Sequence, residues 1–238
     1  MATWEHKLSW PGVAGGFVGK SRRPRPGSDD PPDRLAAALA EMGAGLTLAE
    51  AEQVHGGEVA RITREMLRGR GRSVSLPGVD GLVTDLPGVA LAIYVADCLA
   101  IFLQHPPTGA IGLAHAGWRG LAANMPGMLV RAALEAFGGE AGELRVALSP
   151  CIRECCFEVG EEVAVAFDDI PEAVDRSLEP SHVDMIRVAR WQLARAGVAE
   201  EGVEVMAGCT RCEPERFASY RWDPERCGRN VALIARER

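Results

Sequence analysis

The stretch VALAIYVADCLAIFLQHPPTGAIGLAHAGWRG, residues 89–120, contains three short apolar runs rich in strand-forming residues. An Ala-Asp pair separates the first run from the second, and a Pro-Pro-Thr-Gly turn separates the second from the third. Runs of this length between Gly, Pro and Asp residues are typical of successive β-strands. The stretch therefore predicts part of a sheet, yet it carries a thiol, Cys98, and an imidazole, His115, where packing side chains alone are expected.

The rest of the chain continues the pattern of strands and adds helices. Strands are predicted for LTLAEAEQV, EVARIT and DGLVTD before this stretch, and for ELRVALS, VEVMAG and RNVALIA after it. Helices are predicted for PPDRLAAALAEMGAG, RGLAANMPGMLVRAALEAFG (interrupted or opened by Pro126), GEEVAVAFDDI and SHVDMIRVARWQLARAG. Residues 64–78 have no apolar period and are predicted to form a mobile loop. Because strands and helices do not alternate strictly, the α+β class is favoured over a doubly wound sheet.

Composition and charge limit the classes of partner. The 238 residues are 47% hydrophobic and 25% charged, as in ordinary globular proteins, and one domain spanning residues 1–238 is expected. A formal net charge of -7 argues against nucleic-acid and anionic-membrane partners. The basic cluster KSRRPRP at 20–26 is the exception and indicates a solvated loop. With no run long enough for a membrane span and no signal-peptide pattern, a cytoplasmic location is expected, and the oligomeric state stays open.

The chain has five histidines, and three of them are predicted to lie outside any site. His6 is near the first residue and His105 precedes a turn, so both are predicted to be exposed and inert. His182 opens a predicted helix and is interpreted as a cap or a surface group. That leaves His55 and His115, which both lie where a predicted strand meets a loop and have glycine close behind.

His55, Cys98 and His115 are the residue types of a zinc site. Two imidazoles and one thiolate match a three-ligand site that keeps its fourth position open for water. Their separations of 43 and 17 residues, however, fit no compact ligand motif. Two core histidines and a buried thiol explain the same pattern, so the residues alone leave both interpretations open.

The segment HAGWRG, residues 115–120, adds two side chains that suit a ligand. Trp118 offers an aromatic face and Arg119 a planar cation beside His115, a combination suited to a base ring and an anion such as phosphate. The same residues also fit the start of a helix with a packing tryptophan and a surface arginine.

Five of the seven cysteines fall in two short segments, SPCIRECCFEVG at 149–160 and CTRC at 209–212. In the first segment no second matching pair follows at a suitable spacing, so a structural zinc site is not expected there. The CxxC of the second segment does not precede a thioredoxin-like helix, so redox chemistry is not favoured.

Taken together, these segments resemble the laccase-domain family, also called multicopper polyphenol oxidases or purine nucleoside phosphorylase-like proteins. The resemblance covers residues 50–235 and is carried, in the family's order, by QVHGGEV, DGLVTD, VADCL, HAGWRG, SPCIRECCFEVG, VDMIRVARWQLARAGV, CTRCEPERFASYR and CGRN. It implies a single layered domain of α/β/β/α type. Residues 1–49 diverge from the family, since Lys20 stands near the place of a usual arginine and a Gly-Gly-x-Ser turn is missing.

The resemblance implies a metal site at His55, Cys98 and His115, which would also be the catalytic residues. It further implies zinc-dependent phosphorolysis of adenosine, inosine or methylthioadenosine to base and ribose 1-phosphate, and deamination of adenosine. The older family name implies copper-dependent phenol oxidation, but five histidines cannot hold a mononuclear copper and a trinuclear cluster. Zinc is therefore the predicted cofactor, although copper can occupy such a site in vitro.

Substrate contacts are predicted for four further residues. Arg119 and Arg221 are candidates for phosphate, and Gln53 and Thr210 for polar contacts with the nucleoside. Asp97 is expected to orient a neighbour rather than to react. Purine nucleoside and phosphate are thus the expected partners, without nucleic acid or membrane, and no carboxylate is assigned as the proton shuttle.

Two other classes of function remain open. A metal-independent hydrolase would use Cys98 as nucleophile and His115 as base on an amide or ester, and the family also suggests editing of peptidoglycan precursors. A metal-binding or scaffold protein without turnover is the third hypothesis.

Overall fold

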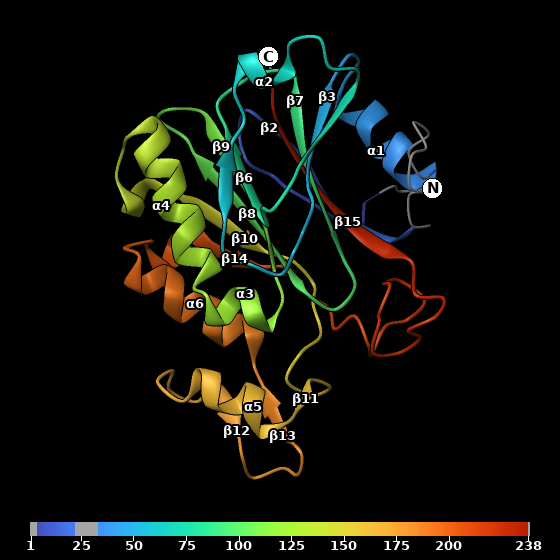
Figure 1. Ribbon diagram of the computed structural model, residues 1–238, viewed down its shortest axis with the longest axis vertical. Helices are drawn as coiled ribbons and strands as arrows, with labels where there is room; N and C mark the ends of the chain where they lie inside the picture. Colours follow the sequence, from blue (N-terminus) through green and yellow to red (C-terminus); the bar gives the residue numbers. More distant parts are fainter. Residues whose placement is uncertain (1–3, 22–32, 238) are drawn as a thin grey trace.

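The computed structural model describes residues 4–21 and 33–237, so the predicted basic loop at 20–26 lies, from residue 22 onward, outside the described part. Two large sheets face each other, and helices cover their outer faces (Figure 1). The first sheet contains, in spatial order, β1 (His6–Lys7), β2 (Val13–Ser21), β15 (Arg229–Arg236), β7 (Val89–Val95), β3 (Thr47–Ala51) and β5 (Ser73–Leu76). The second contains β14 (Val203–Val205), β10 (Arg145–Leu148), β8 (Leu99–His105), β9 (Ala110–Ala116), β6 (Gly81–Thr84) and β4 (Val59–Arg61).

The helices form the two outer layers. The outer face of the first sheet is covered by α1 (Asp33–Met42), and that of the second by α3 (Trp118–Ala122), α4 (Met125–Phe137) and α6 (Met185–Arg195) (Figure 1). A small sheet at one end of the molecule contains β11 (Glu158–Val159), β13 (Ser181–Val183) and β12 (Val174–Asp175), beside α5 (Glu161–Ala164). The remaining short helices are α2 (Arg64–Leu67), η1 (Ala141–Glu143), η2 (Val165–Phe167) and η3 (Glu200–Gly202). The predicted α+β class and α/β/β/α layering are confirmed.

Three apolar cores explain why the central strands read as continuous apolar runs. In β7, Leu91 and Ile93 pack between the two sheets, whereas Ala90 packs in the core that contains α1. In β8, Phe102 packs between the sheets and Ile101 packs in the core beneath α4 and α6. Because successive side chains of a strand point to opposite faces, a strand with a core on each side is apolar throughout.

Two local predictions change in detail. Residues 64–78 are not a loop, because they contain α2 and the edge strand β5, which pairs in parallel with β3. Only Val74 of β5 is buried, so the strand has little apolar pattern to reveal it. The helix predicted around Pro126 is two helices, since Asn124 adopts a left-handed conformation between them and Pro126 lies in the first turn of α4.

Among the helices within residues 4–21 and 33–237, none combines the length and the hydropathy needed to cross a membrane.

Sheet pairing brings His55, Cys98 and His115 to one end of the two facing sheets. Strands β3 and β7 are parallel neighbours in the first sheet, so both chains leave it at the same end. The chain then crosses to the second sheet twice, through His55 between β3 and β4 and through Cys98 between β7 and β8. In the second sheet β9 pairs with β8 and places His115 opposite Ala100, close to the second crossing.

The core between the sheets predicts a clear effect on stability. Replacing Leu91, which is fully buried, with alanine should lower the free energy of unfolding by about 2–5 kcal/mol, because the truncation loses buried apolar surface and leaves a cavity. The matched control is Leu178→Ala at a side chain that is 45% exposed, where a change within about 0.5 kcal/mol is expected. Urea unfolding followed by circular dichroism measures both. Equal effects at the two positions would contradict the assigned core.

Candidate metal and small-molecule site

The structure brings His55, Cys98 and His115 together. Their potential ligand atoms all lie within 4.8 Å of one another. The two imidazole rings meet edge to face, with centroids 4.7 Å apart and an interplanar angle of 90°. Gly117 is part of this packing, because a Cβ atom there would lie 3.0 Å from the Cys98 sulfur.

The backbone at this site is strained. Gln53, His55 and Asp97 have positive φ angles of 65°, 62° and 78°. Residues other than glycine adopt this region rarely, and they keep it only where the surrounding contacts hold them there. All three lie in the two chain crossings, so the strain coincides with the cluster of histidine and cysteine side chains.

A fourth residue, Asp80, holds the cluster in place and has no role in the predictions from sequence. Its fully buried carboxylate lies 2.7 Å from His115 Nδ1 and accepts hydrogen bonds from the backbone N–H groups of His55 (2.9 Å) and Gly56 (2.7 Å). With Nδ1 bound to the carboxylate, Nε2 is the ring nitrogen left to act as a ligand or base. One signal was available in DGLVTD, because a carboxylate that enters a buried strand needs a partner.

The charges at the site favour the thiolate of Cys98. Burial acts to raise the pKa of the Cys98 thiol, but hydrogen bonds and charge from His115 and then His55 outweigh it and lower the pKa to about 7. Burial acts to lower the pKa of His115, whereas its bonds to Asp80 and Cys98 raise that pKa to about 9. The pKa of Asp80 is below its ordinary value, since the bonds to His115 and to two backbone N–H groups outweigh burial. The thiolate is the form that binds metals and attacks electrophiles.

The donor set of two imidazoles and a thiolate fits a zinc ion with an open fourth position. The other three histidines lie elsewhere. His6 and His182 bind backbone carbonyl groups, and His105 contacts Thr108 at 2.8 Å and Glu143 at 3.3 Å. The prediction that His105 is exposed is wrong, because the turn after β8 and the segment that contains Glu143 leave it 1% exposed.

A cavity of about 900 Å³ opens beside the cluster, within the range of small-molecule sites. Its walls include aromatic, acidic and basic side chains besides the cluster. The full set of lining residues besides the cluster is Glu50, Ala51, Glu52, Gln53, Ser75, Tyr94, Val95, Ala96, Asp97, Ile152, Phe157, Tyr220, Arg221 and Arg229.

Gln53 and Arg221, two of the predicted contact residues, line this cavity. The Gln53 side chain binds the backbone of Tyr94 with both amide atoms, at 2.6 and 2.9 Å, so much of its hydrogen-bonding capacity holds the crossing in place. The Arg221 guanidinium lies 5.7 Å from the centre of the Phe157 ring and donates to the carbonyl of Glu158. It is exposed, so it remains accessible to an anion.

Arg119 and Thr210 do not join the cavity lining that the described residues form. Arg119 stacks on Trp118, with 4.2 Å from its guanidinium carbon to the ring centre, as expected for the surface alternative. Thr210 is fully buried and donates to Asp97 at 2.6 Å. Asp97 also accepts the backbone N–H of Arg221 at 2.7 Å, which agrees with its expected orienting role.

The second arginine of the cavity is Arg229, for which the sequence predicts no role. Its side chain donates to the carbonyl of Gly228 at 2.7 Å. It belongs to the segment CGRN, which carried the family resemblance without a residue assigned, and this was the available signal.

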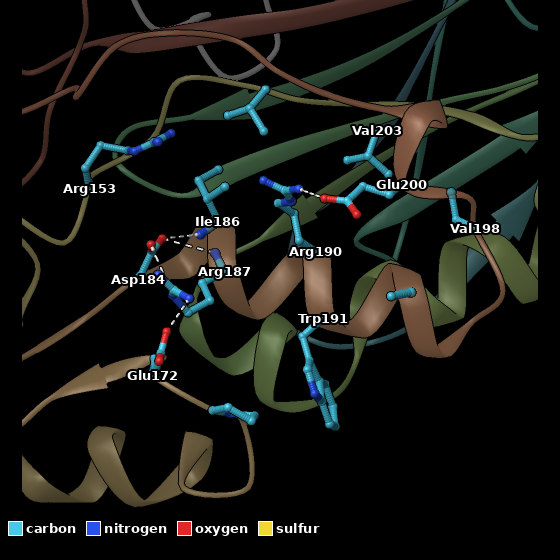
Figure 2. Close-up of a pocket in the computed structure, with 13 residues that line it drawn as sticks. Arg153, Glu172, Asp184, Ile186, Arg187, Arg190, Trp191, Val198, Glu200 and Val203 are labelled. Carbon is cyan, nitrogen blue, oxygen red and sulfur yellow. Dashed lines mark hydrogen bonds and ion pairs between the residues drawn. The ribbon is translucent and has the colours of Figure 1, made fainter.

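A second cavity, of about 780 Å³, lies along α6. Figure 2 shows two ion pairs in its lining, with Arg190 bound to Glu200 at 2.6 Å and Arg187 to Glu172 at 2.9 Å. Among the residues that the structure describes, no histidine or cysteine lines it. The cavity beside His55, Cys98 and His115 is therefore the candidate functional site.

Comparison with known proteins finds a matching family model, similar sequences and a similar solved structure. Residues 27–237 match the family model described as multi-copper polyphenol oxidoreductase laccase. The chain is 37% identical over 194 residues to "Purine nucleoside phosphorylase YlmD" of Geobacillus stearothermophilus, covering 78% of this chain and 70% of that protein. It is 33% identical over 175 residues to "Adenosine deaminase RL5" of an unknown prokaryotic organism, covering 70% and 65%. The crystal structure of the Geobacillus YlmD superimposes with a TM-score of 0.82 at 32% identity, covering 96% and 93% of the two chains.

The contacts of Asp80 predict an effect on metal affinity. Asp80→Asn leaves one oxygen for His115 but removes the charge and the second acceptor, so zinc affinity should fall by about 10–100-fold. Competition with a chromogenic chelator measures the affinity. The control is Asp85→Asn in the same segment, where no change is expected because the Asp85 side chain lies outside the cluster. Unchanged affinity in Asp80→Asn would show that this carboxylate does not support the site.

Proposed function

Since the chain belongs to the multi-copper polyphenol oxidoreductase laccase family, we propose that it is a zinc-dependent enzyme of purine nucleosides. The relatives named purine nucleoside phosphorylase and adenosine deaminase support this class of enzyme. The proposed reactions are phosphorolysis of adenosine, inosine or methylthioadenosine to base and ribose 1-phosphate, and deamination of adenosine.

The observation that carries the proposal is the position of the His55, Cys98 and His115 cluster in the wall of a cavity with aromatic and basic side chains. These three residues would hold the zinc ion, which when bound supplies Lewis-acid chemistry at the reacting group. Asp80 keeps the His115 ring in one orientation through Nδ1. Because the three side chains line the cavity, chemistry that the ion would supply would be available to a molecule bound there.

The cavity has suitable groups for each part of a nucleoside. Phe157 and Tyr220 offer aromatic surface on which a purine base can stack. Arg221 and Arg229 are the arginines of the lining and would bind phosphate during phosphorolysis. Glu50 accepts a hydrogen bond from the Tyr94 hydroxyl, which fixes a carboxylate in the same cavity. We assign to Glu50 the proton transfer that deamination requires, a role for which the sequence offered no candidate.

A metal-independent hydrolase is the second candidate, and the lowered pKa of Cys98 beside His115 favours it. In that mechanism Cys98 would attack an amide or ester and His115 would receive and return the proton. Such an enzyme, including one that edits peptidoglycan precursors, would keep its activity after complete removal of metal. A scaffold protein without turnover would show metal binding alone. Oxidation of phenols by several coppers is not proposed. Two of the five histidines belong to the cluster, which is too few to bind a mononuclear copper and a trinuclear copper cluster.

The first test follows turnover of adenosine and inosine by chromatography, with and without phosphate. Cys98→Ala should lower the rate by about 100-fold or more, since losing a ligand costs more than losing a partner of a ligand. His55→Ala should behave alike, with His6→Ala as the control because His6 bonds a backbone carbonyl outside the cluster. Full purine turnover by chelator-treated wild-type protein would reject zinc dependence and favour a metal-independent reaction of Cys98 and His115. Wild-type rates in Cys98→Ala would reject both mechanisms.

The second test separates phosphate binding from the chemistry of the base. Arg221→Ala and Arg229→Ala should each raise the KM for phosphate by about 10-fold, the effect of losing roughly one charge-assisted hydrogen bond. Deamination of adenosine, which uses no phosphate, should change by no more than about threefold. Arg226→Ala is the matched control, because Arg226 is exposed outside the lining of the cavity. An equal loss of both activities would indicate that the arginines support the structure rather than bind phosphate.

A further inference from the structure

We propose that Cys155, Cys156, Cys209 and Cys212 form a second metal site, a structural zinc site with four thiolate ligands. The two parts of the site come from CIRECC and CTRC, which lie more than 50 residues apart in the sequence. None of these cysteines belongs to the cluster of His55, Cys98 and His115, so the proposal is independent of the proposed enzymatic function.

The sulfur positions match the ligand shell of one tetrahedral zinc ion. All four sulfur atoms lie within 4.8 Å of one another. Cys155 is 3.7, 3.8 and 3.7 Å from Cys156, Cys209 and Cys212, and Cys156 is 3.3 Å from Cys212. Four sulfurs that each lie about 2.3 Å from a central zinc ion are about 3.8 Å apart along the edges of the tetrahedron. The cluster thus needs little movement to enclose one ion.

These distances also argue against other uses of the thiols. A disulfide joins its sulfurs at about 2.05 Å, well below the distances in this cluster. In a polynuclear iron-sulfur cluster the thiolates bind different iron atoms and therefore lie farther apart than around one ion. Four thiolates about one centre are the usual ligand set of structural zinc.

Donors to the sulfurs surround the cluster as they do in thiolate metal sites. The backbone N–H of Arg153 points to the Cys209 sulfur at 3.5 Å, and the Arg211 guanidinium to the Cys156 sulfur at 3.6 Å. A positive charge and N–H donors offset the negative charge that four thiolates bring to one zinc ion. Cys156 and Cys209 are buried, whereas Cys155 and Cys212 are exposed and leave a path by which the ion can enter.

The sheet explains how distant segments meet and why the sequence led to the opposite expectation. Strands β10 and β14 are parallel neighbours, so the chains that follow them leave the sheet at the same end. An isolated parallel β-bridge, formed by the backbones of Cys151 and Cys209, extends this pairing beyond the strands. The second pair of cysteines that the first segment lacked in the sequence is therefore CTRC itself.

The proposed zinc would join a segment that lines the cavity to a neighbouring segment that supports it. Ile152 and Phe157 flank the first pair of cysteines and line the cavity. Thr210 lies between the second pair and binds Asp97, which in turn holds the backbone of Arg221. An ion at the four sulfurs would hold these segments against each other, so its role is to stabilise the wall rather than to react.

The test measures zinc in the full chain carrying Cys98→Ala, which removes a ligand of the other site. After incubation with excess zinc under reducing conditions and desalting, mass spectrometry of the metal should find about one zinc per chain. The further double change Cys155→Ser and Cys212→Ser, at the two exposed thiols, should abolish this zinc and lower the Tm by about 5 °C or more. Cys227→Ser, at a buried cysteine outside both clusters, should leave the zinc content unchanged.

A second measurement does not depend on the folding of the double variant. Cobalt added to metal-free Cys98→Ala protein should give strong near-ultraviolet charge-transfer bands and the intense visible bands of tetrahedral cobalt bound by four thiolates. Absence of both zinc and these bands would overturn the proposal, as would zinc that persists in the double variant or a chain that takes up iron alone. Purine turnover is measured separately in protein that keeps Cys98. A failure of the four-thiolate zinc site can therefore be told apart from a failure of the proposed enzymatic function.

Discussion

The buried carboxylate of Asp80 is the interaction on which the candidate active site depends. It binds the ring of His115 and the backbone N–H groups of His55 and Gly56, so one side chain joins the loop after β3 to β9. Without it, the buried imidazole of His115 would lose its partner at a cost of about 1–3 kcal/mol, and the backbone N–H groups of His55 and Gly56 would lose theirs as well. The same contacts hold His55 at a positive φ, which an unsupported loop would relax.

Asp97 has a corresponding role at the second chain crossing, beside the same cavity. It ties the crossing between β7 and β8 to Thr210 and to the backbone of Arg221. Cys98 follows it directly, so the residue that positions this wall is next to the thiolate of the cluster. The candidate active site and the proposed structural zinc site are thus connected through Asp97 and Thr210, and their ligands suit different roles. The first has an open set of two imidazoles and one thiolate, and the second has a closed set of four thiolates.

The central residues of the site could be predicted from residue types, whereas the residues that hold them in place could not. His55, Cys98 and His115 are candidates because imidazole and thiol groups are unusual beside apolar strands, and the family resemblance then implies that the three form one metal site. Arg119 was predicted for substrate because it neighbours His115 in the sequence, but in α3 its side chain stacks on Trp118 and does not line the cavity. A position next to His115 in the sequence did not show which groups the side chain of Arg119 would contact. The burial of His105 likewise depends on a contact with Glu143, which lies in a distant segment of the chain.

The sequence by itself determined the apolar strands, the principal helices, the layered α+β class and the chemical types available for a site. Tertiary structure alone decided that Asp80 supports His115, that Arg229 reaches the cavity, and that two cysteine segments become one cluster. The physical reason is that periodicity reports only which face of an element is buried. Parallel pairing of β3 with β7 and of β10 with β14 sets which chain ends meet, and that pairing joins residues far apart in the sequence.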